Sequence, residues 1–428
     1  MLIRISPLLF IIFYIALGVG VSVFGPVEYK GYEYGLVIAY VASFLVLFSI
    51  GFGVGLSIPI EESTAVGDDR LIRRIFHVSL AVTALILLVE LVRRASGEGL
   101  AIDISDVGNA YFQAYAGYER NTGDYSLSFI LSTLVAAPAF IATVWGLFYF
   151  WRLSLLDKLL VVLLILATLV LYTVGQGKQK QFGDYAIFFV GILAIKIGAR
   201  GRLRFRDVAI GSSIFVFAVL ALSFLLGKRY DAIDVNYSTI NARIHPLQSI
   251  RLDSSIFDIF GQKLGFSLAM LSQYLSSGYY GLSLGLQQDF TWTWFLGESY
   301  SVAVIFNRWF GFPFMFEQTY PVQIGYTTGW GASKWVSIFP WLASDWTYPG
   351  ALVVLAIFAA IYARVWRESI EYRNPFAILI FCLLNIGVVY IPANNQLVHT
   401  PGAIITGIVA FGLYFAFGPR FNAAPRAG

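Results

Sequence analysis

One segment of the chain, Gly227 to Tyr348, concentrates the residue types that could bind a ligand and transfer a proton. It contains seven of the ten tryptophans, several carboxylates and several arginines. Aromatic rings offer flat apolar faces that suit sugar rings, and planar guanidinium groups bind phosphate oxygens through paired hydrogen bonds. The arginines that we expect to bind phosphate are Arg229, Arg243, Arg251 and Arg308. The pattern predicts a ligand that carries both sugar rings and a phosphate.

Three residues of this segment, His245, Glu298 and Asp345, are our candidates for catalytic proton transfer. A hydroxyl group is a poor nucleophile near neutral pH, so its attack needs a nearby proton acceptor. His245 titrates in a suitable range and lies two residues from Arg243. Asp345 follows the aromatic run Trp335–Trp341. Each also has a structural explanation, because His245 precedes a proline and Asp345 could cap a helix.

A second candidate for ligand binding is the short segment Gly175–Asp184, which holds three glycines and two lysines. Glycine lets the backbone approach a ligand closely, and Lys178 and Lys180 would supply positive charge. This composition suits a pyrophosphate group. The alternative is a pair of lysines that extend to lipid headgroups. The spacing is not that of a nucleotide-binding P-loop.

These candidates are embedded in a chain of 428 residues, of which 58% are hydrophobic and 13% are charged. Such a composition is typical of a membrane protein with many spans and excludes an ordinary soluble domain. Cys382 is the only cysteine, so a disulfide within the chain is impossible. The three histidines lie far apart and no Asp-x-Asp triplet occurs. We therefore expect no metal site, no cofactor and no nucleic-acid partner.

Apolar runs of about 17 to 25 residues mark membrane-spanning helices. The sequence predicts an all-α polytopic protein with about ten transmembrane helices, at Ile5–Phe24, Gly35–Ile58, Ile75–Val92, Leu127–Phe150, Leu159–Val174, Tyr185–Gly198, Val208–Leu226, Pro349–Tyr362, Phe376–Ile391 and Ala403–Phe417. The first run lacks an A-x-A-like cleavage site, so we expect it to be retained. Residues 1–226 then hold seven spans, residues 227–348 form one large loop, and residues 349–428 hold three spans and a tail.

Two stretches of the large loop, Leu264–Leu275 and Trp292–Phe316, are also apolar. If both crossed the membrane, the chain would have twelve spans. The connection between them carries no Lys or Arg, which argues against a cytoplasmic turn. We therefore expect helices that lie in the outer interface.

The distribution of Lys and Arg predicts the orientation of the chain. Alternate connections are rich in basic residues, namely Arg70, Arg73, Arg74, Arg152, Lys158, Arg200, Arg202, Arg204, Arg206, Arg364, Arg367 and Arg373. These connections should face the cytoplasm together with both termini. The large loop should then face the periplasm of a bacterial inner membrane, and we expect the active site on that side.

Two segments of the large loop resemble motifs of bacterial O-antigen, or oligosaccharide repeat-unit, polymerases of the Wzy type. These are Tyr274–Leu284, with the sequence YLSSGYYGLSL, and Trp335–Asp345, with the sequence WVSIFPWLASD. The segment Gly175–Asp184 is similar to a Gly/Lys-rich loop of the same family. The resemblance implies a C-type glycosyltransferase-like fold and adds Tyr279, Tyr280 and Trp335 to the expected substrate-binding residues.

The resemblance also implies a reaction. A growing glycan on undecaprenyl pyrophosphate would be transferred to the terminal hydroxyl group of a new lipid-linked repeat unit, and undecaprenyl pyrophosphate would leave. This reaction needs neither a sugar nucleotide nor a metal ion, and its stereochemical outcome is left open. The implied partners are lipid-linked glycans, the bilayer and a chain-length regulator protein.

Three other functions are alternatives. An O-antigen ligase would use the same donor with lipid A core as the acceptor, and the Tyr279–Tyr280 segment favours the polymerase. A polysaccharide flippase or other transporter more often shows two-fold repetition and polar residues within its spans, and these spans are poor in both. A membrane O-acyltransferase would need a membrane-embedded histidine with a partner, for which His77 is a weak candidate.

Overall fold

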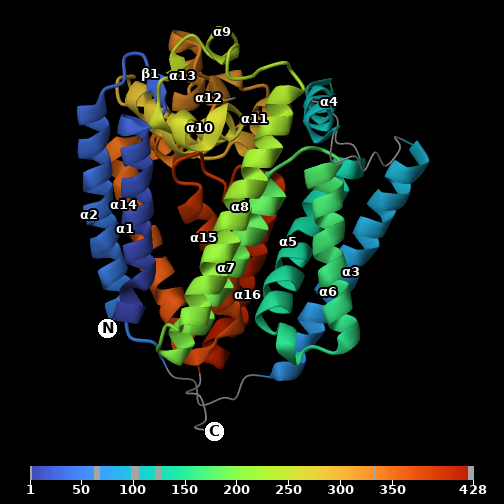
Figure 1. Ribbon diagram of the computed structural model, residues 1–428. Coiled ribbons are helices and arrows are strands. Elements are labelled where there is room, and N and C mark those ends of the chain that lie inside the picture. Colours follow the sequence, from blue (N-terminus) through green and yellow to red (C-terminus); the bar gives the residue numbers. More distant parts are fainter. Residues whose placement is uncertain (1, 62–67, 98–105, 121–126, 332–333, 423–428) are drawn as a thin grey trace. The chain divides into compact units, whose positions relative to one another are not determined.

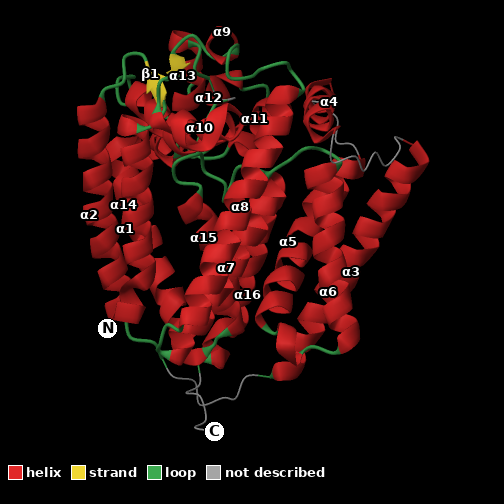
Figure 2. Cartoon of the chain, viewed as in Figure 1, coloured by secondary structure: helices red, strands yellow, loops and turns green. Residues whose placement is uncertain are grey.

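The computed structural model describes residues 2–61, 68–97, 106–120, 127–331 and 334–422. These residues are mostly helical, and the strands among them form one two-stranded ribbon (Figure 2). Within them, nine helices are long and apolar enough to cross a membrane. The all-α, multi-pass architecture expected from the hydropathy pattern is therefore confirmed.

The nine candidate spans agree with nine of the ten apolar runs. They are α1 (Leu2–Phe24), α2 (Tyr34–Ser57), α3 (Asp69–Gly97), α5 (Leu127–Phe148), α6 (Leu155–Thr168) with its π-helical end η3 (Leu169–Val174), α7 (Lys180–Arg200), α8 (Phe205–Asp231), α14 (Ile338–Arg367) continued by η4 (Glu368–Tyr372), and α16 (Pro401–Phe417) with η5 (Gly418–Phe421). The remaining run, Phe376–Ile391, forms α15 (Pro375–Val389), an apolar helix of only 15 residues.

Most of the other helices belong to the large loop, and all of them except the kinked, 31-residue α10 (Ser255–Gly285) are shorter than the candidate spans. They are α9 (Ile240–Arg243), α10, α11 (Tyr300–Phe310), α12 (Pro313–Glu317) and α13 (Tyr320–Thr328), with α4 (Val107–Arg120) and η2 (Phe150–Arg152) elsewhere in the chain. The apolar run Trp292–Phe316 contains α11 and part of α12, of 11 and 5 residues. Neither helix is long enough to cross a bilayer. The structure therefore does not support the alternative with twelve spans.

The chain divides into two compact units. Unit 1 comprises Met1–Ser57, Ile233–Ala363 and Gly387–Pro401. In this unit α9 to α13 gather at one end of α1, α2 and α14 (Figure 1). The strand β1 (Val27–Tyr29) pairs antiparallel with β2 (Gln248–Ile250). These contacts join the large loop to the first two spans, and residues 233–348 of the loop belong to unit 1.

The middle of α10 lies unusually close to its neighbours in unit 1. A Cβ atom at Gly278 would lie 1.6 Å from the carbonyl oxygen of Pro392, and one at Gly281 would lie 2.5 Å from the Cα atom of Val336. Only glycine fits at such distances. Between these glycines, Tyr279 and Tyr280 are 0% exposed. The Ser-Ser-Gly-Tyr-Tyr-Gly sequence therefore packs the core of this unit.

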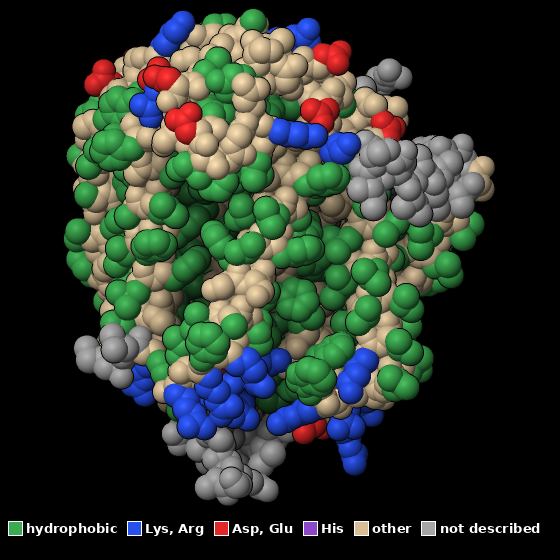
Figure 3. Space-filling model, viewed as in Figure 1, with side chains coloured by type: hydrophobic (Ala, Val, Ile, Leu, Met, Phe, Trp, Pro, Cys, Tyr) green, Lys and Arg blue, Asp and Glu red, His purple; other side chains and the backbone are tan. Residues whose placement is uncertain are grey.

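Unit 2 comprises Ile58–Ala232, Arg364–Ile386 and Gly402–Gly428. Here α3 packs on α5 and α6, while α7 packs on α5, α8 and η4, and α4 packs on α8. Figure 3 shows Lys and Arg side chains gathered around the turn between α7 and α8. At this turn Arg200 forms an ion pair with the buried Asp207 at 2.8 Å. The expected cytoplasmic orientation depends on these basic residues.

The orientation can be tested by cysteine labelling. Asn236 is exposed in the large loop, whereas the only native cysteine, Cys382, is fully buried. In intact spheroplasts, Asn236→Cys should react with a membrane-impermeant maleimide, and Arg202→Cys in the α7–α8 turn should react only after lysis. Native Cys382 should give little background. The reverse pattern would overturn the positive-inside assignment.

Candidate active site

Asp345, near the start of α14, binds the loop Thr293–Glu298 of the same unit. Its side chain accepts hydrogen bonds from the Thr293 hydroxyl group, the Phe295 N–H group at 2.8 Å and the Glu298 N–H group at 2.9 Å. The residue is only 5% exposed. These bonds occupy lone pairs that a catalytic base would need. Asp345, predicted from the sequence as a catalytic residue, is therefore placed to hold this loop.

The loop held by Asp345 has an uncommon backbone conformation. Trp294 and Phe295 both have positive φ angles, of 57° and 62°. Non-glycine residues seldom adopt this left-handed conformation, which costs conformational energy unless the surroundings stabilise it. The hydrogen bond from the Phe295 N–H group to Asp345 is one such stabilising contact. The turn leaves both aromatic side chains more than half exposed, at 56% and 55%.

Four aromatic side chains form what we call the ring surface: Trp292, Trp294, Phe295 and Trp346. Trp292 stacks on Trp294 with 4.4 Å between ring centroids, and Phe295 lies 5.4 Å from Trp292 and 5.0 Å from Trp346. Their exposed fractions range from 37% to 56%. Clustered exposed rings mark either a membrane interface or a ligand surface.

Glu298 lies at the edge of the ring surface, where its carboxyl group accepts a hydrogen bond from the Trp346 indole N–H group. The residue is half-buried. Burial raises the pKa of the Glu298 carboxyl group, the bond from Trp346 opposes this shift, and the nearby Asp345 charge adds to it. A carboxyl group with a raised pKa is suited to general acid–base catalysis. Of the three sequence candidates, Glu298 has the most suitable surroundings for this role.

The segment after α15 supports the same loop from another side. The Asn395 side chain donates to the Glu298 carbonyl oxygen at 3.2 Å, and the Ser301 hydroxyl group donates to the His399 carbonyl oxygen at 2.6 Å. The His399 ring stacks on Tyr300 with 5.5 Å between centroids. His399 is therefore a further titratable group next to the loop that carries Glu298.

His245 uses both ring nitrogens in local contacts. Its Nδ1 atom accepts a hydrogen bond from the Leu247 N–H group at 3.2 Å, so the ring proton lies on Nε2 and points to the Gly329 carbonyl oxygen at 3.1 Å. Partial burial lowers the pKa of His245 and so favours this neutral form. The ring has no free lone pair with which to accept a proton. The structure therefore gives His245 a structural role.

The arginines of the large loop bind mainly to the protein backbone. Arg243 donates to the Ile233 carbonyl oxygen at 2.8 Å, and Arg251 donates to the carbonyl oxygens of Phe24 and Gly25. Arg308 is exposed on α11. Arg251 therefore links the start of the large loop to the end of α1.

The expected substrate-binding aromatic residues lie mostly in the core. Tyr280 donates to the Lys30 carbonyl oxygen at 2.7 Å and stacks on Tyr29 with 4.7 Å between centroids. Tyr279 is likewise buried, whereas Trp335 is half-buried and lies 5.8 Å from the Tyr274 ring. The two tyrosines offer no exposed surface to a ligand.

A separate cationic cluster, consisting of Lys178, Lys180 and Arg229, lies in unit 2. Arg229, at the end of α8, donates to the Gly177 carbonyl oxygen at 3.0 Å and lies 3.5 Å above the Tyr111 ring. Lys180 pairs with Asp184 at 2.5 Å, and Lys178 is exposed. The segment Gly175–Asp184 thus meets α4 and the end of α8, as its glycines permit.

Several buried polar atoms of the neighbouring residues 173–184 have no hydrogen-bond partner in the described part of the chain. They are Thr173 Oγ1, Gln176 Oε1, Gln179 Nε2, Gln181 Oε1 and Asp184 Oδ1. A buried polar group without a partner costs about 1–3 kcal/mol, so native proteins seldom leave such groups unpaired. Amide and hydroxyl groups next to cations suit a guest with both negative charge and hydroxyl groups.

Thr293 and Trp346 are site residues that the sequence did not single out. Trp346 directly follows Asp345, and Thr293 lies between two tryptophans. These neighbours do not indicate that the two residues meet through the loop Thr293–Glu298.

Among the described residues, no group of three His, Cys, Asp or Glu side chains could hold a metal ion. No family model, curated protein or solved structure matches this chain.

Proposed function

We propose that this protein is a membrane glycosyltransferase that polymerises lipid-linked oligosaccharide repeat units of a bacterial surface polysaccharide. The position of Glu298 carries the proposal. Its carboxyl group is half-buried, has a raised pKa and lies at the edge of four exposed aromatic rings. This arrangement pairs a proton acceptor with flat apolar faces that suit sugar rings.

In the proposed reaction, the terminal hydroxyl oxygen of the acceptor repeat unit attacks the anomeric carbon of the donor glycan. The bond from that carbon to the pyrophosphate oxygen breaks, and the lipid pyrophosphate leaves with the bonding electrons. The proton of the attacking hydroxyl group passes to Glu298. The ring surface would hold a sugar ring in reach of this carboxylate, which lowers the entropic cost of the encounter.

The cationic cluster of unit 2 supports an anionic lipid-linked substrate. Lys178, Lys180 and Arg229 supply positive charge, and the Gln179 side-chain NH2 group is an unpaired donor beside them. Charge-assisted hydrogen bonds of this kind bind phosphate oxygens strongly and stabilise developing negative charge. Within unit 2, this cluster suits the phosphate head group of a lipid-linked molecule, and we propose it as a binding site by itself.

The principal alternative is an O-antigen ligase, which shares the donor but uses a different acceptor. In the sequence, the segment around Tyr279 and Tyr280 favours the polymerase over the ligase. Because both tyrosines are buried in the core, this segment does not distinguish the two acceptors. A transporter would move the lipid-linked glycan without forming a new glycosidic bond, so it would not need Glu298.

The purified full-length protein, reconstituted in vesicles with lipid-linked repeat units, should convert them into a ladder of longer glycans. Addition of EDTA should leave the ladder unchanged. A ligase would form a product only when lipid A core is added, and a transporter would form none. The absence of any new glycosidic bond with both acceptors would refute a transferase function.

A matched pair of arginine variants tests this phosphate-binding site in the same assay. Arg229→Gln should raise the KM for the lipid-linked donor about 10-fold or more, the effect of losing one charge-assisted hydrogen bond. Arg243→Gln is the control, because Arg243 is exposed and binds the Ile233 carbonyl oxygen. Equal KM values for both variants and the native protein would show that the cationic cluster does not bind the lipid-linked donor.

A further inference from the structure

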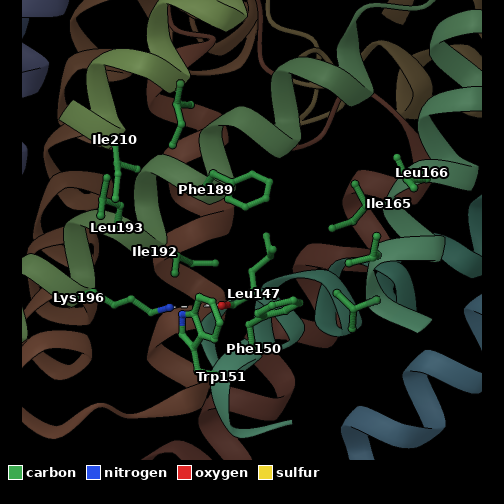
Figure 4. A pocket seen from close by; sticks show the side chains of 13 residues that line it. Leu147, Phe150, Trp151, Ile165, Leu166, Phe189, Ile192, Leu193, Lys196 and Ile210 are labelled. Atoms are coloured by element: carbon green, nitrogen blue, oxygen red, sulfur yellow. Dashed lines mark hydrogen bonds between the residues drawn. The ribbon is translucent and has the colours of Figure 1, made fainter. Parts of the chain in front are cut away.

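Unit 2 contains an apolar cavity of about 480 Å³ among its long helices, and none of the candidate site residues lines it. Figure 4 shows its lining side chains, which come from the end of α5, from η2 and from α6, α7 and α8. Among the lining residues, Lys196 of α7 is the one charged side chain. The volume falls within the roughly 300–1,000 Å³ that is usual for small-molecule sites.

The cavity opens at the surface of the unit. Its floor includes the buried side chains Val161 and Ile192, which are 1% and 4% exposed. Its edge includes Val162, Leu166 and Phe189, which are 42%, 52% and 41% exposed. These residues belong to helices that are candidate membrane spans. The opening would therefore face the hydrocarbon chains of lipids.

Lys196 has no anionic partner within the described chain. Its Nζ atom donates one long hydrogen bond of 3.4 Å to the Leu147 carbonyl oxygen and lies 5.8 Å from the Phe148 ring. By contrast, Arg200, one turn further along α7, pairs with Asp207 at 2.8 Å. A half-buried ammonium group without a counter-charge is costly, so Lys196 favours an external anion.

The position of Lys196 along its helix indicates where that anion lies. The backbone of Lys196 lies four residues, about 6 Å along the helix axis, before the end of α7 at Arg200. The turn that follows carries the exposed residues Arg202, Arg204 and Arg206. A lysine at this depth can extend its amine to the level of lipid phosphates while its stem stays in the apolar layer.

We propose that this cavity binds one anionic glycerophospholipid from the leaflet that contacts the α7–α8 turn. The phosphate would pair with Lys196, and one acyl chain would lie along the apolar lining toward Phe189 and Leu166. Charge complementarity selects this occupant. A zwitterionic lipid carries its own cation, and a partner helix would need a carboxylate at this depth. The inference is independent of the proposed transferase activity.

Native mass spectrometry of the full-length protein, with phosphatidylglycerol and phosphatidylcholine of identical acyl chains, tests the proposal. The native protein should retain one phosphatidylglycerol more tightly than phosphatidylcholine. Lys196→Gln should weaken phosphatidylglycerol binding about 5-fold, which is the contribution of one cation near anionic lipid. Lys196→Arg should keep the preference, and this variant also shows that substitution at this position is compatible with folding.

Two further variants distinguish lipid binding in the cavity from general electrostatic attraction of anionic lipids to the basic end of α7. Arg202→Gln removes an exposed charge from the same end of α7 without touching the cavity, so it should keep the tightly bound lipid. Val162→Trp fills the cavity while Lys196 remains, so it should release the lipid. Equal affinity of the native protein for the two lipids, or an unchanged preference in Lys196→Gln, would overturn the proposal.

Discussion

Replacement of Glu298 by glutamine should lower the turnover of glycan transfer by about 10²–10⁴-fold, the range expected for loss of a general base. Glutamine keeps the size of the side chain, and its carbonyl oxygen can still accept the bond from Trp346. Donor binding and thermal stability should therefore change little. Glu317→Gln is the matched control, because Glu317 is an exposed carboxylate of the same unit.

The pH dependence of turnover gives a second measurement on Glu298. A base acts in its deprotonated form, so the rate should fall as pH decreases through the pKa of Glu298, which lies above the usual glutamate value of 4.5. Trp346→Phe removes the hydrogen bond that lowers this pKa. The variant should move the acidic limb of the profile to higher pH. An acidic limb that stays in place in Trp346→Phe, or full turnover in Glu298→Gln, would identify another base, with His399 the next to test.

Asp345→Ala should destabilise unit 1 as well as abolish transfer. The change leaves the N–H groups of Phe295 and Glu298 without their acceptor, while the Thr293 hydroxyl group keeps the Ser344 carbonyl oxygen as its acceptor. Each unpaired buried donor costs about 1–3 kcal/mol, and water can reach part of this loop, so we expect a loss of roughly 2–4 kcal/mol. Thermal unfolding in detergent should show a clear drop in the midpoint.

A graded series distinguishes a positioning role from a catalytic role for Asp345. Asp345→Asn keeps one acceptor oxygen and should give an intermediate loss of stability, with turnover falling in parallel. Asp253→Ala, at an exposed aspartate of the same unit, should have no such effect. If Asp345→Asn lost turnover completely while its unfolding midpoint stayed native, Asp345 would be the base after all.

The long helices could be predicted from the sequence because membrane insertion requires long apolar runs. Hydropathy alone did not reveal the structure of Trp292–Phe316, which is apolar enough to look like a span. The chain breaks there at Gly311, whose φ angle is 66° and which ends α11. Such a break depends on local backbone geometry, which average hydropathy does not record.

The sequence and the structure rank the candidate residues differently. Composition drew attention to the carboxylates of the large loop and ranked His245 and Asp345 ahead of Glu298, whereas the hydrogen bonds in the structure favour Glu298 as the candidate base. The difference between these residues lies in hydrogen bonds to distant segments, such as the 50-residue separation between Phe295 and Asp345. For Tyr279 and Tyr280, the flanking glycines were the available signal, because they indicate close helix packing as readily as ligand approach.

Asp345 holds the Thr293–Glu298 loop largely through main-chain N–H groups, and this has a consequence for the evolution of specificity. The side chains of Trp294 and Phe295 do not take part in the anchoring bonds. Their identities can change while the loop stays in place, within the limits that a positive φ angle sets. Asparagine or glycine would even relax the backbone. Related chains could therefore acquire different ligand preferences by exchanging two residues on an unchanged scaffold.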